Sequence, residues 1–94
     1  MNAMQRRVQP AGGLRPALIR WRGKSYTIAE ANALAVQEQF LGNLQVAANL
    51  YGLILTRLPD CAEVYNNRGA IWQTMGRYED AMGSYDQALA LKPD

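Results

Sequence analysis

The chain has 94 residues, of which 49% are hydrophobic and 19% charged, a composition typical of one small folded domain. It contains a single cysteine, Cys61, and no histidine, so an internal disulfide, a cysteine-based metal site and the usual general base are excluded. We therefore expect a cytoplasmic, non-enzymatic protein with no metal site, no cofactor and no membrane span.

Residues 1–27 are predicted to form a basic and largely flexible arm. Six of the ten basic residues precede Glu30, the first acidic residue, which leaves four basic and eight acidic residues for the body. Because the start of the arm is rich in polar residues, Pro and Gly, it cannot bury enough apolar surface to offset the entropy of ordering. The arginines are scattered, so a solvated terminus is favoured over an arm that binds an acidic partner, nucleic acid or lipid headgroups. A nucleic-acid partner is therefore not expected.

A short ordered hairpin is predicted within this arm, at residues 17–28. Leu18 to Trp21 would form one strand and Ser25 to Ile28 the other, with the turn at Arg22-Gly23-Lys24. Two interpretations stay open. The aromatic side chains of this segment either cover the first helix of the body, or the segment lies in a binding groove as an autoinhibitory or partner-mimicking strand.

Four helices are predicted after residue 27, from hydrophobic periodicity and from signals at their ends. Thr27 with Glu30 indicates a capping box at the first helix, and Asp60 with Glu63 indicates one at the third. Asn43 is a candidate cap for the second helix. The predicted helices cover residues 28–41, 44–58, 62–75 and 78–91.

The last two predicted helices carry the residue pattern of a known helical repeat. The landmarks are Tyr65, Gly69, Trp72, Gly76, Ala81, Tyr85, Ala88 and Pro93. Their spacing fits the pattern W-x2-L-G-x2-Y…A-x3-F…P of the tetratricopeptide repeat, and residues 62–94 closely resemble that family. One position departs from the pattern, since Arg68 stands where the family has Leu.

A weaker copy of the same pattern precedes it. A shift of 34 residues, the period of the family, aligns eight identical pairs among 33. The pairs are Asn32/Asn66, Gln39/Gln73, Gly42/Gly76, Ala47/Ala81, Tyr51/Tyr85, Leu55/Leu89, Pro59/Pro93 and Asp60/Asp94. The resemblance implies an all-α fold, in which two antiparallel helix–turn–helix pairs stack as a short right-handed solenoid. Residues 28–61 would be a degenerate repeat and residues 62–94 a well-matched one.

The resemblance also implies a groove, lined by the first helix of each pair, that binds a peptide or a partner protein. The expected lining is Asn32, Val36, Gln39, Phe40, Glu63, Asn66, Asn67, Ala70, Gln73 and Thr74. Side-chain amides both donate and accept hydrogen bonds, which suits capture of a peptide main chain. None of these residues is basic, so a receptor for the carboxylate end of a chaperone tail is not expected. The alternative for this face is an ordinary solvated surface.

These features predict a protein-interaction module, with one alternative from another class. Asn67 resembles the asparagine ladder in the tetratricopeptide region of O-linked N-acetylglucosamine transferases and their bacterial relatives, although Ala33 holds the matching place in the first copy. The chain would then be an N-terminal regulatory or substrate-recruiting segment of a longer enzyme or repeat array. If the chain is complete, a homo-oligomer is expected through apolar residues left uncovered on the last helix. The candidates are Met82, Leu89 and Leu91.

Overall fold

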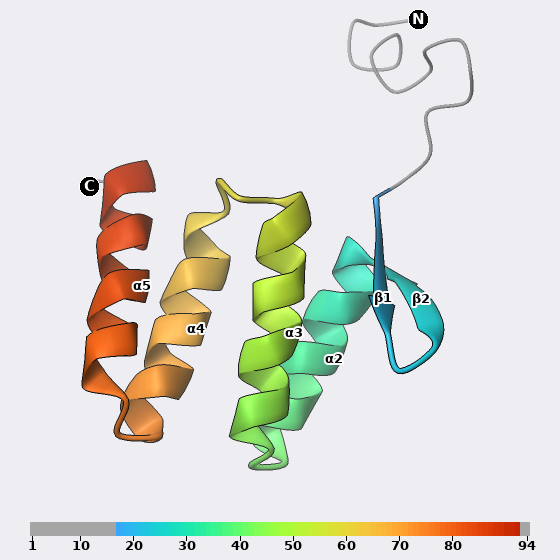
Figure 1. Ribbon diagram of the computed structural model, residues 1–94, viewed down its shortest axis with the longest axis horizontal. Helices are drawn as coiled ribbons and strands as arrows, with labels where there is room; N and C mark the ends of the chain where they lie inside the picture. The colour runs from blue at the N-terminus through green and yellow to red at the C-terminus, as the bar shows by residue number, and fades with distance from the viewer. Residues whose placement is uncertain (1–16, 93–94) are drawn as a thin grey trace, which may run out of the picture.

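The computed structural model describes residues 17–92 (Figure 1). Its elements are β1 Leu18–Trp21, β2 Lys24–Thr27, α2 Ile28–Phe40, α3 Leu44–Arg57, α4 Ala62–Thr74 and α5 Tyr78–Leu91. The four predicted helices are present, and each ends within one residue of its predicted end. The all-α prediction is incomplete, because β1 and β2 form a small antiparallel sheet. The part of the predicted flexible arm before residue 17 lies outside the described residues.

The two strands are joined by a turn of two residues. Arg22 and Gly23 both have positive φ, at 50° and 79°, as a type I′ hairpin turn requires. The register pairs Trp21 with Lys24 and Leu18 with Thr27. The second strand therefore begins at Lys24, one residue earlier than predicted, and Ile28 belongs to the helix that follows.

The hairpin packs on the first helix pair. Ile19 is buried and joins the core, and the rings of Trp21 and Tyr26, 6.4 Å apart, pack against the same core. β1 contacts both α2 and α3, and β2 contacts α2. The hairpin and α5 thus lie at opposite ends of the molecule (Figure 1).

The junction between the hairpin and α2 is a complete capping box. Thr27 is at once the last residue of β2 and the N-cap of α2. Its Oγ1 accepts a hydrogen bond from the backbone N–H of Glu30 at 3.1 Å, and its own N–H donates to Glu30 Oε1 at 2.8 Å. Such a cap contributes about 1 kcal/mol of stability. The predicted capping box is confirmed, and it joins strand to helix without a linker.

The other two predicted caps are wrong. Asn43 occupies the N-cap position of α3, but its side chain instead donates to Glu38 Oε2 at 2.6 Å, across the turn. Helix α4 begins after Cys61, so Asp60 lies one residue too early, and Cys61 makes no side-chain capping bond.

A single buried core runs through the described part of the chain. Its members are Ile19, Ala31, Ala35, Ala47, Ala48, Leu50, Tyr51, Ile54, Val64, Ile71, Trp72 and Ala81. Helix α3 contributes the most of these residues, and it contacts α2 on one side and α4 on the other. The two helix pairs therefore share one core through α3.

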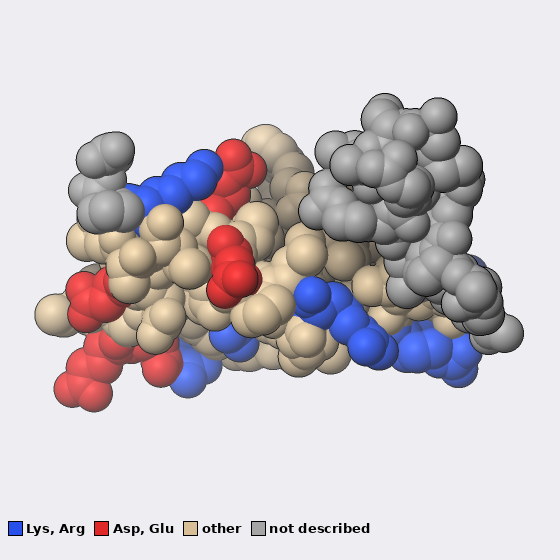
Figure 2. All heavy atoms as spheres, turned by 90° about the horizontal axis from the view of Figure 1, so that it is seen from above, with Lys and Arg blue, Asp and Glu red and all other residues tan. Residues whose placement is uncertain are grey.

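The charge asymmetry of the sequence is preserved on the surface. In Figure 2, Lys and Arg side chains gather at the hairpin end and Asp and Glu side chains are most frequent toward α5. The hairpin carries Arg20, Arg22 and Lys24, and α5 carries Glu79, Asp80 and Asp86. None of the helices in residues 17–92 is long and apolar enough to cross a membrane.

Candidate functional site

The ten predicted groove residues all lie on α2 and α4, and none is fully buried. Asn32, Val36, Gln39 and Ala70 are half-buried, whereas the other six are exposed. Phe40, at the C-terminal end of α2, is 88% exposed. The predicted face is therefore accessible on both helices.

Three of the ten residues, Asn32, Glu63 and Asn67, come together in one pocket of about 290 Å³. The pocket lies between the N-terminal halves of α2 and α4, and we call it the α2–α4 pocket. Its full lining is Ile28, Ala29, Asn32, Ile54, Leu58, Cys61, Glu63, Val64 and Asn67. Two amides and one carboxylate thus accompany a mainly apolar lining, an arrangement common in sites that bind organic ligands.

Tyr51 of α3 interacts with one of these amides. The Tyr51 side chain is buried, and burial raises the pKa of its phenol, while a hydrogen bond with the Asn67 side chain opposes that shift. The phenol therefore stays neutral at physiological pH and helps to orient the Asn67 amide. Because an amide has two donors and an acceptor, Asn67 keeps hydrogen-bonding capacity for a ligand.

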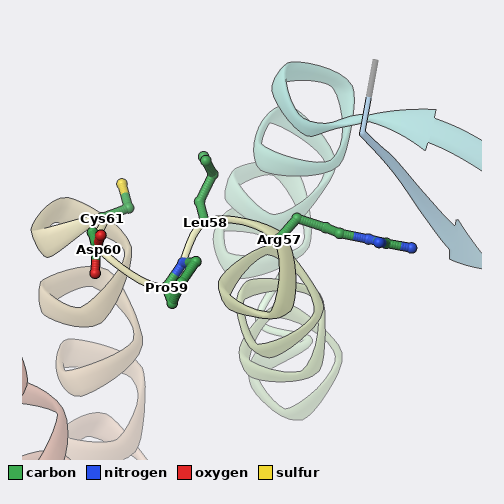
Figure 3. Close-up of a pocket in the computed structure, with 5 residues that line it drawn as sticks. All are labelled: Arg57, Leu58, Pro59, Asp60 and Cys61. Carbon is green, nitrogen blue, oxygen red and sulfur yellow. The ribbon is translucent and has the colours of Figure 1, made fainter. Parts of the chain in front are cut away.

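A second pocket, of about 350 Å³, lies beside the first at the loop between α3 and α4. It is lined by Arg57, Leu58, Pro59, Asp60 and Cys61 (Figure 3). Figure 3 shows Leu58 and the sulfur of Cys61 projecting from the same side of the loop, while Arg57 extends away from them. Leu58 and Cys61 line both pockets, so the two pockets are neighbours.

Two other predicted groove residues are engaged within the fold. The Gln73 Oε1 accepts a hydrogen bond from the Tyr85 hydroxyl at 3.0 Å, which ties α4 to α5. The Thr74 hydroxyl donates to the Ala70 carbonyl at 2.9 Å within its own helix. Neither residue lines the α2–α4 pocket.

Sequence reasoning missed the apolar part of the pocket. Ile54, Leu58 and Val64 line it, and none of them is among the ten predicted groove residues. Leu58 lies directly before Pro59, where the helix cannot continue, and this was the available signal that its side chain leaves the buried face of α3. Within residues 17–92, no three His, Cys, Asp or Glu side chains are grouped to hold a metal ion.

The packing of α4 on α5 depends on small residues. A Cβ atom placed on Gly69 would lie 2.9 Å from Cε1 of Tyr85, a distance that real Cβ contacts do not reach. Ala81 is buried, and the turn between the helices passes through Gly76 at φ 77°. This is the close-packed helix–turn–helix that the spacing of the sequence predicts.

Residues 62–94 match the tetratricopeptide repeat family. The matched segment contains α4, the turn at Gly76 and α5. Tetratricopeptide repeats generally mediate protein–protein interactions. No curated protein matches the chain.

Arg68, the departure from the tetratricopeptide pattern, bridges α4 to α3. Its Nε donates to the Ala48 carbonyl at 3.1 Å, and its Cζ lies 5.2 Å from the centre of the Trp72 ring. A Cβ atom on Gly52 would lie 2.9 Å from Nη2, so the glycine inside α3 leaves the space that the guanidinium occupies. Burial lowers the pKa of Arg68, and the nearby Asp80 opposes this shift.

Proposed function

We propose that the chain is a non-enzymatic protein-interaction module that binds an extended peptide segment of a partner protein at the α2–α4 pocket. The observation that carries this proposal is a mainly apolar pocket that is lined by Asn32 of α2 and by Asn67 of α4. The tetratricopeptide match of residues 62–94 supports it, since such repeats generally mediate protein–protein interactions.

We infer that residues 28–61 form a second, degenerate repeat, so that the two pairs build a short right-handed solenoid with the groove along α2 and α4. Three correspondences between the pairs support this. Gly42 has φ 82° where Gly76 has 77°, Ala47 and Ala81 are both buried, and Tyr51 and Tyr85 each interact with an amide side chain of α4.

The chemistry of the pocket defines the peptide that fits it. An apolar side chain would enter beside Ile54 and Leu58, since burial contributes about 25 cal/mol for each Å² of apolar surface removed from water. Asn32 and Asn67 would hydrogen-bond the peptide main chain on either side of that residue. Glu63 favours a basic residue next to the apolar one, because opposite charges attract at this half-open site.

Replacing Asn67 with alanine is expected to weaken peptide binding by about 5- to 10-fold, because each amide hydrogen bond contributes about 1 kcal/mol. The double variant Asn32→Ala/Asn67→Ala should lose about 30- to 100-fold if the two bonds are independent. The peptides are selected from a random display library against the full chain, and fluorescence anisotropy gives each Kd.

Asn66→Ala is the matched control, because Asn66 is the neighbouring exposed amide and does not line the pocket. Its Kd should stay within about 2-fold of that of the unchanged chain, as for surface positions away from a site. Equal losses in the Asn66 and Asn67 variants would place the peptide elsewhere. Retained helical circular dichroism excludes unfolding as the cause of any loss.

A second copy of the chain is the proposed partner for α5. Met82 and Leu89 are 64% and 58% exposed, and helical periodicity places them on one side of α5 with the exposed Tyr78. Leu91 was also predicted for this face. At about 100° per residue it lies roughly 200° from Leu89 around the helix, so we do not include Leu91 in the contact face. Sedimentation equilibrium should show a mass that rises with concentration, and Met82→Lys should abolish the rise; a constant monomer mass contradicts this contact.

The alternative is that this chain is a regulatory or substrate-recruiting segment of a longer, glycosyltransferase-like enzyme. Its support is that Asn67 has an amide neighbour in the pocket, Asn32, although the 34-residue alignment pairs Asn67 with Ala33. The same pocket would then hold a peptide substrate near a catalytic domain. The gene sequence after Asp94 distinguishes this alternative from a free-standing module.

A further inference from the structure

A trough of about 500 Å³ lies on another side of α4, between α3 and α5. Its lining is Gln45, Tyr65, Arg68, Trp72, Arg77, Glu79, Asp80, Gly83, Ser84 and Gln87. We call it the α3–α5 trough. It shares no lining residue with the α2–α4 pocket, and the average directions of the α4 residues in the two linings differ by roughly 125° around the helix.

The guanidinium of Arg68 is held in place at the trough before any ligand arrives. Nε is engaged by the Ala48 carbonyl, Gly52 lies against Nη2, and the Trp72 ring is 5.2 Å from Cζ. These contacts fix the plane of the guanidinium, whose terminal nitrogens lie beside Gly52 of α3. Little side-chain entropy is then left to lose when an anion binds.

The terminal nitrogens of Arg68 have no protein acceptor within residues 17–92. The ion pair in the trough is that of Arg77 with Asp80, at 2.7 Å, and no hydrogen bond in the described part of the chain reaches Nη1 or Nη2 of Arg68. No fully buried side-chain nitrogen or oxygen of these residues lacks a partner, so both terminal nitrogens keep some solvent-exposed surface. A planar donor pair with unused hydrogens matches the two oxygens of a carboxylate.

We propose that the α3–α5 trough binds an acidic peptide segment, with one Asp or Glu carboxylate held by the two terminal nitrogens of Arg68. The charges of the trough favour a single carboxylate over a phosphate dianion or nucleic acid, because Arg68 and Arg77 are balanced by Glu79 and Asp80. The trough is a binding surface separate from the α2–α4 pocket and does not depend on the function proposed for that pocket.

The rest of the lining suits an extended segment around that carboxylate. Gln45 donates its Nε2 hydrogen to Asn49 at 2.9 Å, which leaves its side-chain oxygen for a peptide N–H. Ser84 and Gln87 of α5 supply further hydrogen-bonding groups on the other wall. Gly83 adds no side chain to this wall, and no atom lies within 4 Å of the place where its Cβ would be.

The test uses the full chain labelled with 15N and two acetylated, amidated hexapeptides that differ only in a central Glu or Gln. The Glu peptide is expected to shift the Arg68 Nε–Hε and Trp72 indole signals saturably, and the Gln peptide to bind at least about 10-fold more weakly, since a charge-assisted bond is lost. Equal shifts with both peptides would overturn the proposal. Tighter binding of inorganic phosphate than of the Glu peptide would also overturn it.

Two substitutions separate recognition from a structural role of Arg68. Arg68→Lys should weaken binding of the Glu peptide about 10-fold, because an ammonium keeps the charge but loses the planar donor pair. Asp80→Asn should strengthen binding several-fold, since it removes a competing carboxylate and releases Arg77. Asp80 is exposed, so this second variant folds even if Arg68→Lys does not.

Asp86→Asn is the matched control for Asp80→Asn. Asp86 lies on the same helix and is exposed, but it does not line the trough. It should change the affinity for the Glu peptide by less than about 2-fold, as a screened surface charge does. Weaker binding in Asp80→Asn, or an equal gain in both variants, would refute a carboxylate site at Arg68.

Discussion

Replacing Gly69 with alanine is expected to destabilise the fold by about 1–3 kcal/mol, the usual cost of overpacking a helix contact. The new Cβ would lie 2.9 to 3.1 Å from three atoms of the Tyr85 ring. The ring cannot swing aside freely, because its hydroxyl is hydrogen-bonded to Gln73 at 3.0 Å. The gain of about 1 kcal/mol from replacing a helical glycine offsets only part of this cost. Urea denaturation followed by circular dichroism measures the change.

Gly83→Ala is the matched control, and it is expected to change the free energy of unfolding in the opposite direction. Gly83 also lies inside a helix, but no atom is within 4 Å of its would-be Cβ. This substitution should stabilise the chain by about 0.5–1 kcal/mol, the difference in helix propensity. If Gly69→Ala gained stability as Gly83→Ala does, the close approach of α4 and α5 would not exist.

Replacing Ile71 with alanine is expected to cost about 2–5 kcal/mol, because it empties a fully buried site. That is a large share of the roughly 5–15 kcal/mol that stabilises an ordinary domain. Since α3 joins the cores of both helix pairs, the first pair should lose stability together with the second. The hairpin packs on α2 and α3, so it should lose stability together with them.

The two tryptophans report on this coupling from different parts of the core. Trp21 lies in the hairpin and Trp72 in α4, so a chain labelled with fluorotryptophan gives one 19F signal for each. Both signals are expected to move to the same lower urea midpoint in Ile71→Ala. Leu41→Ala, at an exposed position outside the proposed binding surfaces, should change stability by less than about 0.5 kcal/mol. If Trp21 kept its original midpoint while Trp72 shifted, the two pairs would unfold independently.

The sequence predicted best what local chemistry decides. The ends of the helices follow from periodicity, from the glycines at 42 and 76 and from the capping box of Thr27 and Glu30, all of which act within a few residues. The failed cap at Asp60 has a different cause. Whether α4 begins after Asp60 or after Cys61 depends on how the chain turns at Pro59, and residue type alone did not show this.

The pocket could be predicted only in part, because it is assembled across helices. Asn66 and Asn67 are adjacent and chemically identical. The sequence could therefore assign both to a helix face, but it could not show which of them lines the pocket. Only tertiary packing distinguishes them. Asn67 lines the pocket together with Asn32 of α2 and interacts with Tyr51 of α3, whereas Asn66 does not line the pocket. The apolar lining was hidden for the same reason, since Ile54 and Val64 belong to the core and to the pocket wall at once.

The position of the hairpin determines at which end of the helix stack further repeats could be added. β1 and β2 occupy a side of the α2–α3 pair, at the end of the molecule opposite to α5, and the capping box fixes them there without a linker (Figure 1). An engineered array could therefore be lengthened past α5, where apolar side chains face outward, but a repeat placed before α2 would first have to displace the hairpin. The hairpin thus covers the α2–α3 end of the helix stack and leaves the α5 end available for added repeats.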